Sequence, residues 1–150
     1  MIENEIIANL LEIIRKEGTI LKRKQNIPFK KYNKDWETQH IVERAFHQAI
    51  QACIDIGARI IAQKNFRAAR DYHDIFIILS EQKVIPMRFC DKMKEMVGFR
   101  NALVHEYRAI SHREVYRHLQ KSLGIFQEFA KHIIKFLERS ESHYSERRKK

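Results

Sequence analysis

Four polar residues in the last third of the sequence have types that could do chemistry together: Arg100, Asn101, His105 and Tyr107. Histidine titrates near neutral pH, and arginine can hold two phosphate oxygens with its planar fork. Cleavage of an RNA phosphodiester needs a base for the 2′-hydroxyl, an acid for the departing 5′-oxygen and a cation for the charge on phosphorus. Since arginine and histidine supply all three, Arg100 and His105 are candidate catalytic residues of a site that needs no metal ion.

Helix geometry limits how these side chains can meet. At about 100° per residue, Arg100 and Tyr107 lie about 20° apart around a helix axis, whereas His105 lies about 140° from Arg100. Either the helix therefore ends near Val104, or a second copy of the chain brings its own arginine and histidine into the same groove. Asn101 lies about 40° round from His105 and one turn before it, so we expect Asn101 to orient the imidazole.

A purely structural interpretation uses the same residues. Arg100 could pair with Glu95 or Glu106, His105 could be a helix-end histidine, and Tyr107 could lie at the edge of the core. Short patterns of polar residues recur by chance. Spacing alone therefore does not choose between a catalytic and a structural role.

The net charge of the chain favours an anionic partner. The 29 lysines and arginines exceed the 19 acidic residues and give a formal charge of +10. Such a field attracts polyanions, nucleic acid first among them. A solvated surface rich in lysine would produce the same balance, so the charge raises the expectation of nucleic acid without deciding it.

Basic residues gather in two groups, and either group could follow phosphates without reading bases. A solvated run of charge is the commoner explanation for such groups. The aromatic residues Phe29, Tyr32 and Trp36 interleave with the first group, which leaves base stacking open, although we expect Trp36 to dock on the protein. The first group, our candidate for RNA backbone contacts, is Lys22, Arg23, Lys24, Lys30 and Lys31, with Lys34 beside it, and the second is residues 147–150.

Apolar periodicity predicts an all-α fold, an antiparallel bundle of about five helices in one domain. Only four glycines and two prolines punctuate the chain, too few for a many-stranded sheet. We expect the domain to cover residues 1–138 and the basic tail 139–150 to fray. The expected helices cover residues 2–24, 35–63 with Asp35 as cap, 69–81, a fourth from Pro86 into the Arg100 segment, and 111–136 with a capping box of Ser111 and Glu114.

Three details complete the predicted bundle. The segment 25–34 is expected to be a basic loop, and Gly57 should permit a close helix crossing. Apolar residues, with Ser122 among them, recur along the last helix at alternating spacings of four and three, a pattern that could face either the core or a second subunit.

The cysteines, and the other residues that could bind a metal ion, give no reason to expect a cofactor. Cys53 and Cys90 lie in apolar helical patterns and indicate neither a disulfide nor a zinc site. Glu37 and His40 form one E-x-x-H pair, but a di-iron bundle needs two. We expect the histidines of the last helix, His112, His118 and His132, to lie at the surface or the core edge.

The amino-terminal segment indicates where the chain works. Residues 1–15 contain three glutamates and no long apolar run. This composition argues against a secretory signal and a membrane span. We therefore expect a cytoplasmic protein.

The segment from Arg100 to Tyr107 resembles the R-x-x-x-x-H-x-Y signature of the HepT-like branch of the HEPN superfamily. The similarity covers residues 10–134 and leaves the basic tail outside. It includes residues 72–79, 84–86 and 96–99, together with 43–45 and 54–57 in the second predicted helix.

The resemblance implies a homodimeric helical bundle whose two signatures meet in a cleft and cut RNA without metal. It further implies the toxin of a type VII-like toxin–antitoxin pair, silenced by a minimal nucleotidyltransferase, MntA, that transfers AMP to the tyrosine corresponding to Tyr107. Negative phosphate and bulk in the cleft would repel an RNA backbone. The alternative is a non-catalytic HEPN module that binds a nucleotide or a nucleotidyltransferase partner, and a third possibility is an interaction bundle without a site. The intact set of Arg100, Asn101, His105 and Tyr107 favours the enzyme.

Overall fold

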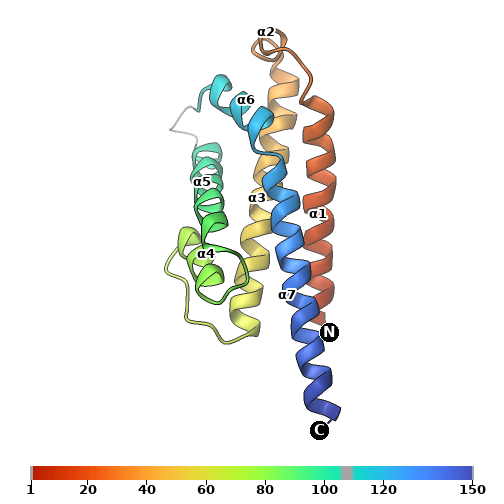
Figure 1. Cartoon of the computed structure of the whole chain (residues 1–150). Helices are drawn as coiled ribbons and strands as arrows, with labels where there is room; N and C mark the ends of the chain where they lie inside the picture. Colours follow the sequence, from red (N-terminus) through yellow and green to blue (C-terminus); the bar gives the residue numbers. More distant parts are fainter. Residues whose placement is uncertain (1, 106–109, 150) are drawn as a thin grey trace.

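The computed structural model describes residues 2–105 and 110–149, with side chains for 4–105 and 110–141. All of its regular elements in these ranges are helices, which confirms the predicted all-α class (Figure 1). They are α1 (Ile2–Lys24), α2 (Phe29–Tyr32), α3 (Trp36–Gln63), α4 (Tyr72–Glu81), α5 (Met87–Val104), α6 (His112–Lys121) and α7 (Gly124–Lys149).

The long helices α1, α3 and α7 form the body of the bundle (Figure 1). The shorter α4 and α5 pack against α3, while α2 and α6 meet at the end where α1 stops and α3 starts. Each helix buries its apolar face against its neighbours, which is the main favourable contribution to folding. The largest fully buried side chains include Tyr32, Phe46, Phe76, Phe89 and Phe129.

Local sequence signals set several helix ends as predicted. Asp35 caps α3, because its carboxylate accepts hydrogen bonds from the Thr38 N–H at 3.1 Å and the Thr38 hydroxyl at 2.8 Å. The crossing predicted at Gly57 is also confirmed. A Cβ atom there would lie 2.5 Å from Ile75 Cγ2 and 3.3 Å from Leu79 Cδ1, so only glycine lets α4 approach α3 this closely.

The predicted fifth helix is instead two helices, α6 and α7. Ser122, which we placed on the apolar stripe, caps the end of α6, and its N–H donates to the carbonyl of His118 at 2.8 Å. The Ser122 hydroxyl lies 2.9 Å from Nδ1 of His118, and the nearby Gly124 opens α7. The Ser111 cap of α6 is confirmed, since its hydroxyl accepts from the Glu114 N–H at 3.1 Å.

Two further boundaries differ from the prediction. The segment 25–34 contains the short helix α2, so it is not wholly a loop. The third predicted helix begins at Tyr72 rather than at Ala69, because Asp71 accepts the Asp74 N–H at 2.8 Å and starts α4 there. The extra helix α2 and the division at Ser122 give seven helices in the described part of the chain rather than about five.

Two side-chain predictions were wrong. His118 is only 2% exposed and lies inside the core, where its ring stacks on Phe99 with centroids 4.0 Å apart. Burial lowers the pKa of this imidazole. Trp36 does not dock on the bundle, because its side chain is 71% exposed. Both Cys53 and Cys90 are buried free thiols.

The helix α7 continues to Lys149, past the domain boundary expected at residue 138. The fraying of residues 139–150 stays a prediction. None of the helices in the described ranges combines the length and the apolarity that a membrane span needs.

Candidate active site

Arg100, in the last turn of α5, is held by contacts from three helices. Its Nε donates to Gln51 Oε1 of α3 at 3.1 Å, and its Nη1 donates to Asn101 Oδ1 at 3.0 Å. The guanidinium carbon lies 5.1 Å from the ring centroid of Tyr72, the first residue of α4, within the range of a cation–π contact. The half-buried guanidinium therefore has a fixed position and a fixed plane.

These contacts leave part of the guanidinium available. Arginine has five N–H groups, and Gln51 and Asn101 each take one. No carboxylate of a described residue pairs with Arg100. Glu95, one partner of the structural interpretation, instead lies 3.7 Å from Nη2 of Arg117, and Glu106 lies outside the described residues. An arginine fixed in this way can hold an anion with its remaining N–H groups.

His105 lies just beyond the end of α5. The helix ends at Val104, which is the first of the two geometries that the spacing allowed. His105 has extended backbone angles, φ −89° and ψ 100°, its N–H donates to the Asn101 carbonyl at 3.2 Å, and its side chain is exposed. Because His105 lies outside the helix, the helical period does not fix the direction of its side chain, and the 140° angle from Arg100 does not apply.

The other two predicted site residues have different outcomes. The Asn101 side-chain carbonyl accepts from Arg100, so this residue helps to orient the arginine. Its predicted role toward the imidazole of His105 stays a prediction. Tyr107 lies outside the described residues.

Three residues near Arg100 were missed by the sequence analysis: His47, Gln51 and Tyr72. His47 is one turn before Gln51 on α3, and Arg44 Nη1 donates to its Nδ1 at 3.4 Å. Partial burial, followed by the positive charges of Arg100 and Arg44, lowers the pKa of His47. The i, i+4 spacing of His47 and Gln51 on one helix face was the available signal.

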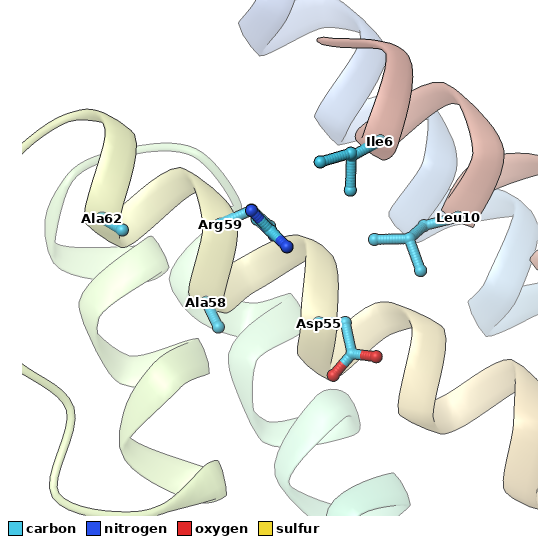
Figure 2. A pocket seen from close by; sticks show the side chains of 6 residues that line it. All are labelled: Ile6, Leu10, Asp55, Ala58, Arg59 and Ala62. Atoms are coloured by element: carbon cyan, nitrogen blue, oxygen red, sulfur yellow. The ribbon is translucent and has the colours of Figure 1, made fainter. Parts of the chain in front are cut away.

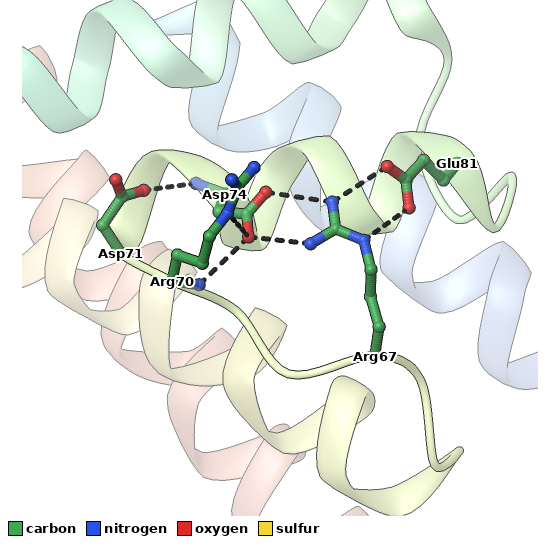
Figure 3. Close-up of polar contacts among 5 residues, drawn as sticks. All are labelled: Arg67, Arg70, Asp71, Asp74 and Glu81. Carbon is green, nitrogen blue, oxygen red and sulfur yellow. Dashed lines mark hydrogen bonds and ion pairs between the residues drawn. The ribbon is translucent and has the colours of Figure 1, made fainter.

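A network of polar contacts joins the segment that precedes α4 to α4 itself (Figure 3). Arg67 donates from Nη1 and Nη2 to both oxygens of Asp74 at 2.8 and 3.0 Å, and from Nε and Nη2 to both oxygens of Glu81 at 3.0 and 2.9 Å. The Arg70 N–H donates to Asp74 at 3.0 Å. These hydrogen bonds hold the pKa of Asp74 well below its usual range. The network fastens the chain before Tyr72 to the body of α4.

A hollow of about 410 Å³ lies between α1 and α3 (Figure 2). Ile6 and Leu10 of α1 face Asp55 and Arg59 of α3 across it. Neither Arg100, Asn101 nor His105 lines this hollow. Asp55 connects it to the site indirectly, because Gln51 Nε2 donates to Asp55 Oδ1 at 2.9 Å.

The basic residues expected to contact RNA lie in another part of the bundle. They occupy the last turn of α1 and the short helix α2, and most are exposed. The described residues contain no group of three or more His, Cys, Asp or Glu side chains that could hold a metal ion.

Residues 5–133 match the family described as Ribonuclease HepT-like. The chain belongs to this family. It is 29% identical over 128 residues to an mRNA nuclease HepT of Shewanella oneidensis, covering 84% of this chain and 94% of that protein. It is also 29% identical over 136 residues to a tRNA nuclease HepT of Aphanizomenon flos-aquae, covering 91% and 92%.

A solved structure extends the similarity to the fold. It shows a tri-AMPylated Shewanella oneidensis HEPN toxin in complex with an MNT antitoxin. The TM-score is 0.80 at 26% identity, and the comparison covers 87% of this HepT-like chain and 97% of the other. The similarity that we saw over residues 10–134 thus reflects family membership.

Proposed function

We propose that this HepT-like chain is a metal-independent endoribonuclease, with Arg100 holding the scissile phosphate and His105 transferring protons. The observation that carries this proposal is the fixed guanidinium of Arg100, which Gln51, Asn101 and Tyr72 hold while, among the described residues, three of its N–H groups have no partner. Two HepT relatives named as nucleases for mRNA and tRNA support RNA as the substrate class.

The proposed reaction balances without a further reagent. A base removes the 2′-hydroxyl proton, the 2′-oxygen forms a bond to phosphorus, and the bond from phosphorus to the 5′-oxygen breaks as an acid protonates that oxygen. Negative charge grows on the phosphate oxygens, where the N–H groups of Arg100 can donate. Histidine side chains can serve as general acid or general base, and we assign these proton transfers to His105.

The biological setting belongs to the same proposal. The related toxin is AMPylated and bound to an MNT antitoxin. By analogy, this chain would act as a homodimeric toxin, silenced when an MntA-like nucleotidyltransferase transfers AMP to Tyr107. The added phosphate would compete with the substrate phosphate for a cationic site.

The test is RNA cleavage by the wild-type chain and by Arg100→Ala and His105→Ala, each in EDTA. We expect wild-type cleavage to persist in EDTA and both variants to lose it. Arg88→Ala is the matched control, since Arg88 is an exposed arginine on the same helix α5. Wild-type activity in either site variant, or activity lost in EDTA and restored by a divalent ion, would contradict the mechanism.

A further inference from the structure

Trp36 is the chain's one tryptophan and the first residue of α3. Its side chain is 71% exposed and, with Lys31, Lys34, Asp35 and Glu37, lines an open hollow of about 400 Å³. Burial of a large aromatic ring stabilises a fold, and this ring contributes little burial. The exposed ring is therefore a flat apolar surface available to a partner.

The other two aromatic residues of this basic group are already engaged inside the protein. Tyr32 is fully buried, and the Phe29 ring packs against Tyr116 with centroids 5.2 Å apart. The Arg113 guanidinium lies 4.3 Å from the Phe29 ring centroid. Of the three aromatics that suggested base stacking, Tyr32 is buried, Phe29 is partly buried and Trp36 is exposed.

The backbone that carries the neighbouring lysines is held in place. The Tyr116 hydroxyl of α6 donates to the Ile27 carbonyl at 2.7 Å, just before α2. The Gln25 side chain donates to the Leu119 carbonyl of α6 at 3.1 Å, and the Gln120 side chain donates to the Gln25 carbonyl at 2.7 Å. Lys31 on α2 and Lys34 after it are therefore presented from a fixed segment.

The charges around the ring favour an anion with an aromatic part. Lys31 and Lys34 are exposed, while both carboxylate oxygens of Asp35 accept hydrogen bonds from Thr38. Glu37 contributes the remaining, exposed, negative charge. The other basic residues at this end of the bundle are Lys22, Arg23, Lys24 and Lys30.

We propose that Trp36 stacks on a base of single-stranded RNA, with Lys31 and Lys34 contacting the adjacent phosphates. Stacking of this kind needs an unpaired base, because the bases of a duplex stack on one another. The carboxyl end of α5, which leads to His105, points toward the same end of the bundle as α2 (Figure 1). This inference rests on the proposed function for the identity of the ligand, and it adds a binding site outside the contacts of Arg100.

The single tryptophan makes the test direct. The full-length His105→Ala chain is titrated with a mixed-sequence RNA strand of about twelve nucleotides, and tryptophan emission is recorded. We expect quenching that saturates with the single strand and is much weaker with the same strand in a duplex. Emission of the RNA-free protein should be that of a water-exposed indole.

Variants in the same background measure affinity by the anisotropy of labelled RNA. Trp36→Ala should weaken binding roughly tenfold, whereas Trp36→Phe should retain most of it because phenylalanine still stacks. Glu37→Gln should bind RNA more tightly, since it removes a negative charge beside the ring. Met87→Ala is the matched control, because Met87 is an 81% exposed apolar side chain on α5 and its loss should leave affinity unchanged.

The possible failures are distinguishable. Emission that stays constant at saturating RNA, or equal affinities of Trp36→Ala and Trp36→Phe, would overturn the stacking site even if the wild-type chain cleaves RNA. Blue-shifted emission before RNA is added would do so too, because it would show that a second chain covers the ring. Saturable quenching without any wild-type cleavage would support the stacking site and contradict the proposed catalysis.

Discussion

Gln51 and Arg100 are 49 residues apart in the sequence, and their side chains are joined by a hydrogen bond of 3.1 Å between α3 and α5. The amide of Gln51 also donates to Asp55 at 2.9 Å, so its carbonyl oxygen is turned toward Arg100. The arginine that binds phosphate in our proposal is thus oriented by a helix that carries none of the predicted signature.

Gln51→Leu should lower the rate of RNA cleavage at saturating substrate by roughly tenfold, because a hydrogen bond to a charged group is lost and the guanidinium is less well oriented. Gln51→Glu should instead raise the half-saturating RNA concentration, since a carboxylate would compete with phosphate for Arg100. Steady-state kinetics separate the two effects. Unchanged kinetics in both variants would show that Gln51 has no positioning role.

Tyr107→Phe should escape silencing by a cognate nucleotidyltransferase and ATP while it keeps most of its RNA cleavage. The phenol has no part in the proposed acid–base steps, so its loss should affect only AMP transfer. Mass spectrometry of the modified wild-type chain should locate AMP on Tyr107.

Two other tyrosines serve as controls for that assignment. The Tyr116 hydroxyl is engaged with the Ile27 carbonyl, and Tyr72 is 39% exposed beside Arg100. Tyr116→Phe and Tyr72→Phe should both remain silenced. AMP found on Tyr72 instead of Tyr107 would refute the assignment.

Gly57→Ala should reduce the free energy of unfolding by about 1–3 kcal/mol, because the new methyl group would overlap Ile75 where α4 crosses α3. Gly18→Ala serves as the control, because it makes the same change at a glycine that is not crowded. Apart from the nearby backbone of α1 itself, no atom of the described residues lies within 4 Å of the new methyl group, so the change should stabilise α1 by roughly 0.5–1 kcal/mol. Urea unfolding followed by circular dichroism measures both, and equal effects would contradict the close crossing.

His118 should make the protein less stable as the pH falls through about 6.5. Burial, then the charge of Arg117, lowers its pKa in the folded state, so the unfolded chain binds the proton first and unfolding becomes more favourable. The loss continues until the pH reaches the lower, folded-state pKa. His118→Gln should flatten this part of the stability curve, measured by urea unfolding between about pH 8 and 5. A curve parallel to that of the wild type would contradict this assignment.

The lowered pKa of His47 acts in the same direction. His47→Gln is therefore measured alongside, so that the contributions of the two histidines are separated. Asp74 does not interfere in this range. Its stabilising charge is lost only as the pH falls below the ordinary carboxyl range toward its lowered native pKa.

The chain should form a homodimer at micromolar concentration if, as we propose, two copies share one active-site cleft. Light scattering across a dilution series measures this, with the Arg100→Ala chain as a check that the site itself does not hold the subunits together. A single monomeric species throughout would count against a two-chain cleft.

Local sequence signals predicted the parts of the fold that depend on local interactions. The ends of α1 and α3 followed from apolar spacing and the Asp35 cap, and Gly57 from its lack of a side chain. The division at Ser122 was missed because the apolar spacing continues across it, although α6 ends at Lys121 with Ser122 as its cap.

Only the site residues that lie close together in the sequence could be predicted. Arg100, Asn101 and His105 share one segment, and the end of α5 at Val104 was one of two geometries that their angles allowed. The contacts of Gln51 and Tyr72 with Arg100 depend on how α3 and α4 pack against α5, which no local pattern records. Trp36 was misplaced because an apolar ring is normally expected to be buried.

The helix end at Val104 also bears on how this segment can tolerate change in evolution. One residue inserted within the helix between Arg100 and Val104 would rotate everything after it by about 100° relative to Arg100. One residue inserted between Val104 and His105 would lengthen only the extended connection, which can adjust by backbone torsion. Chains with different numbers of residues between arginine and histidine could therefore keep the same pair of groups at one site, provided that the extra residues lie beyond the helix.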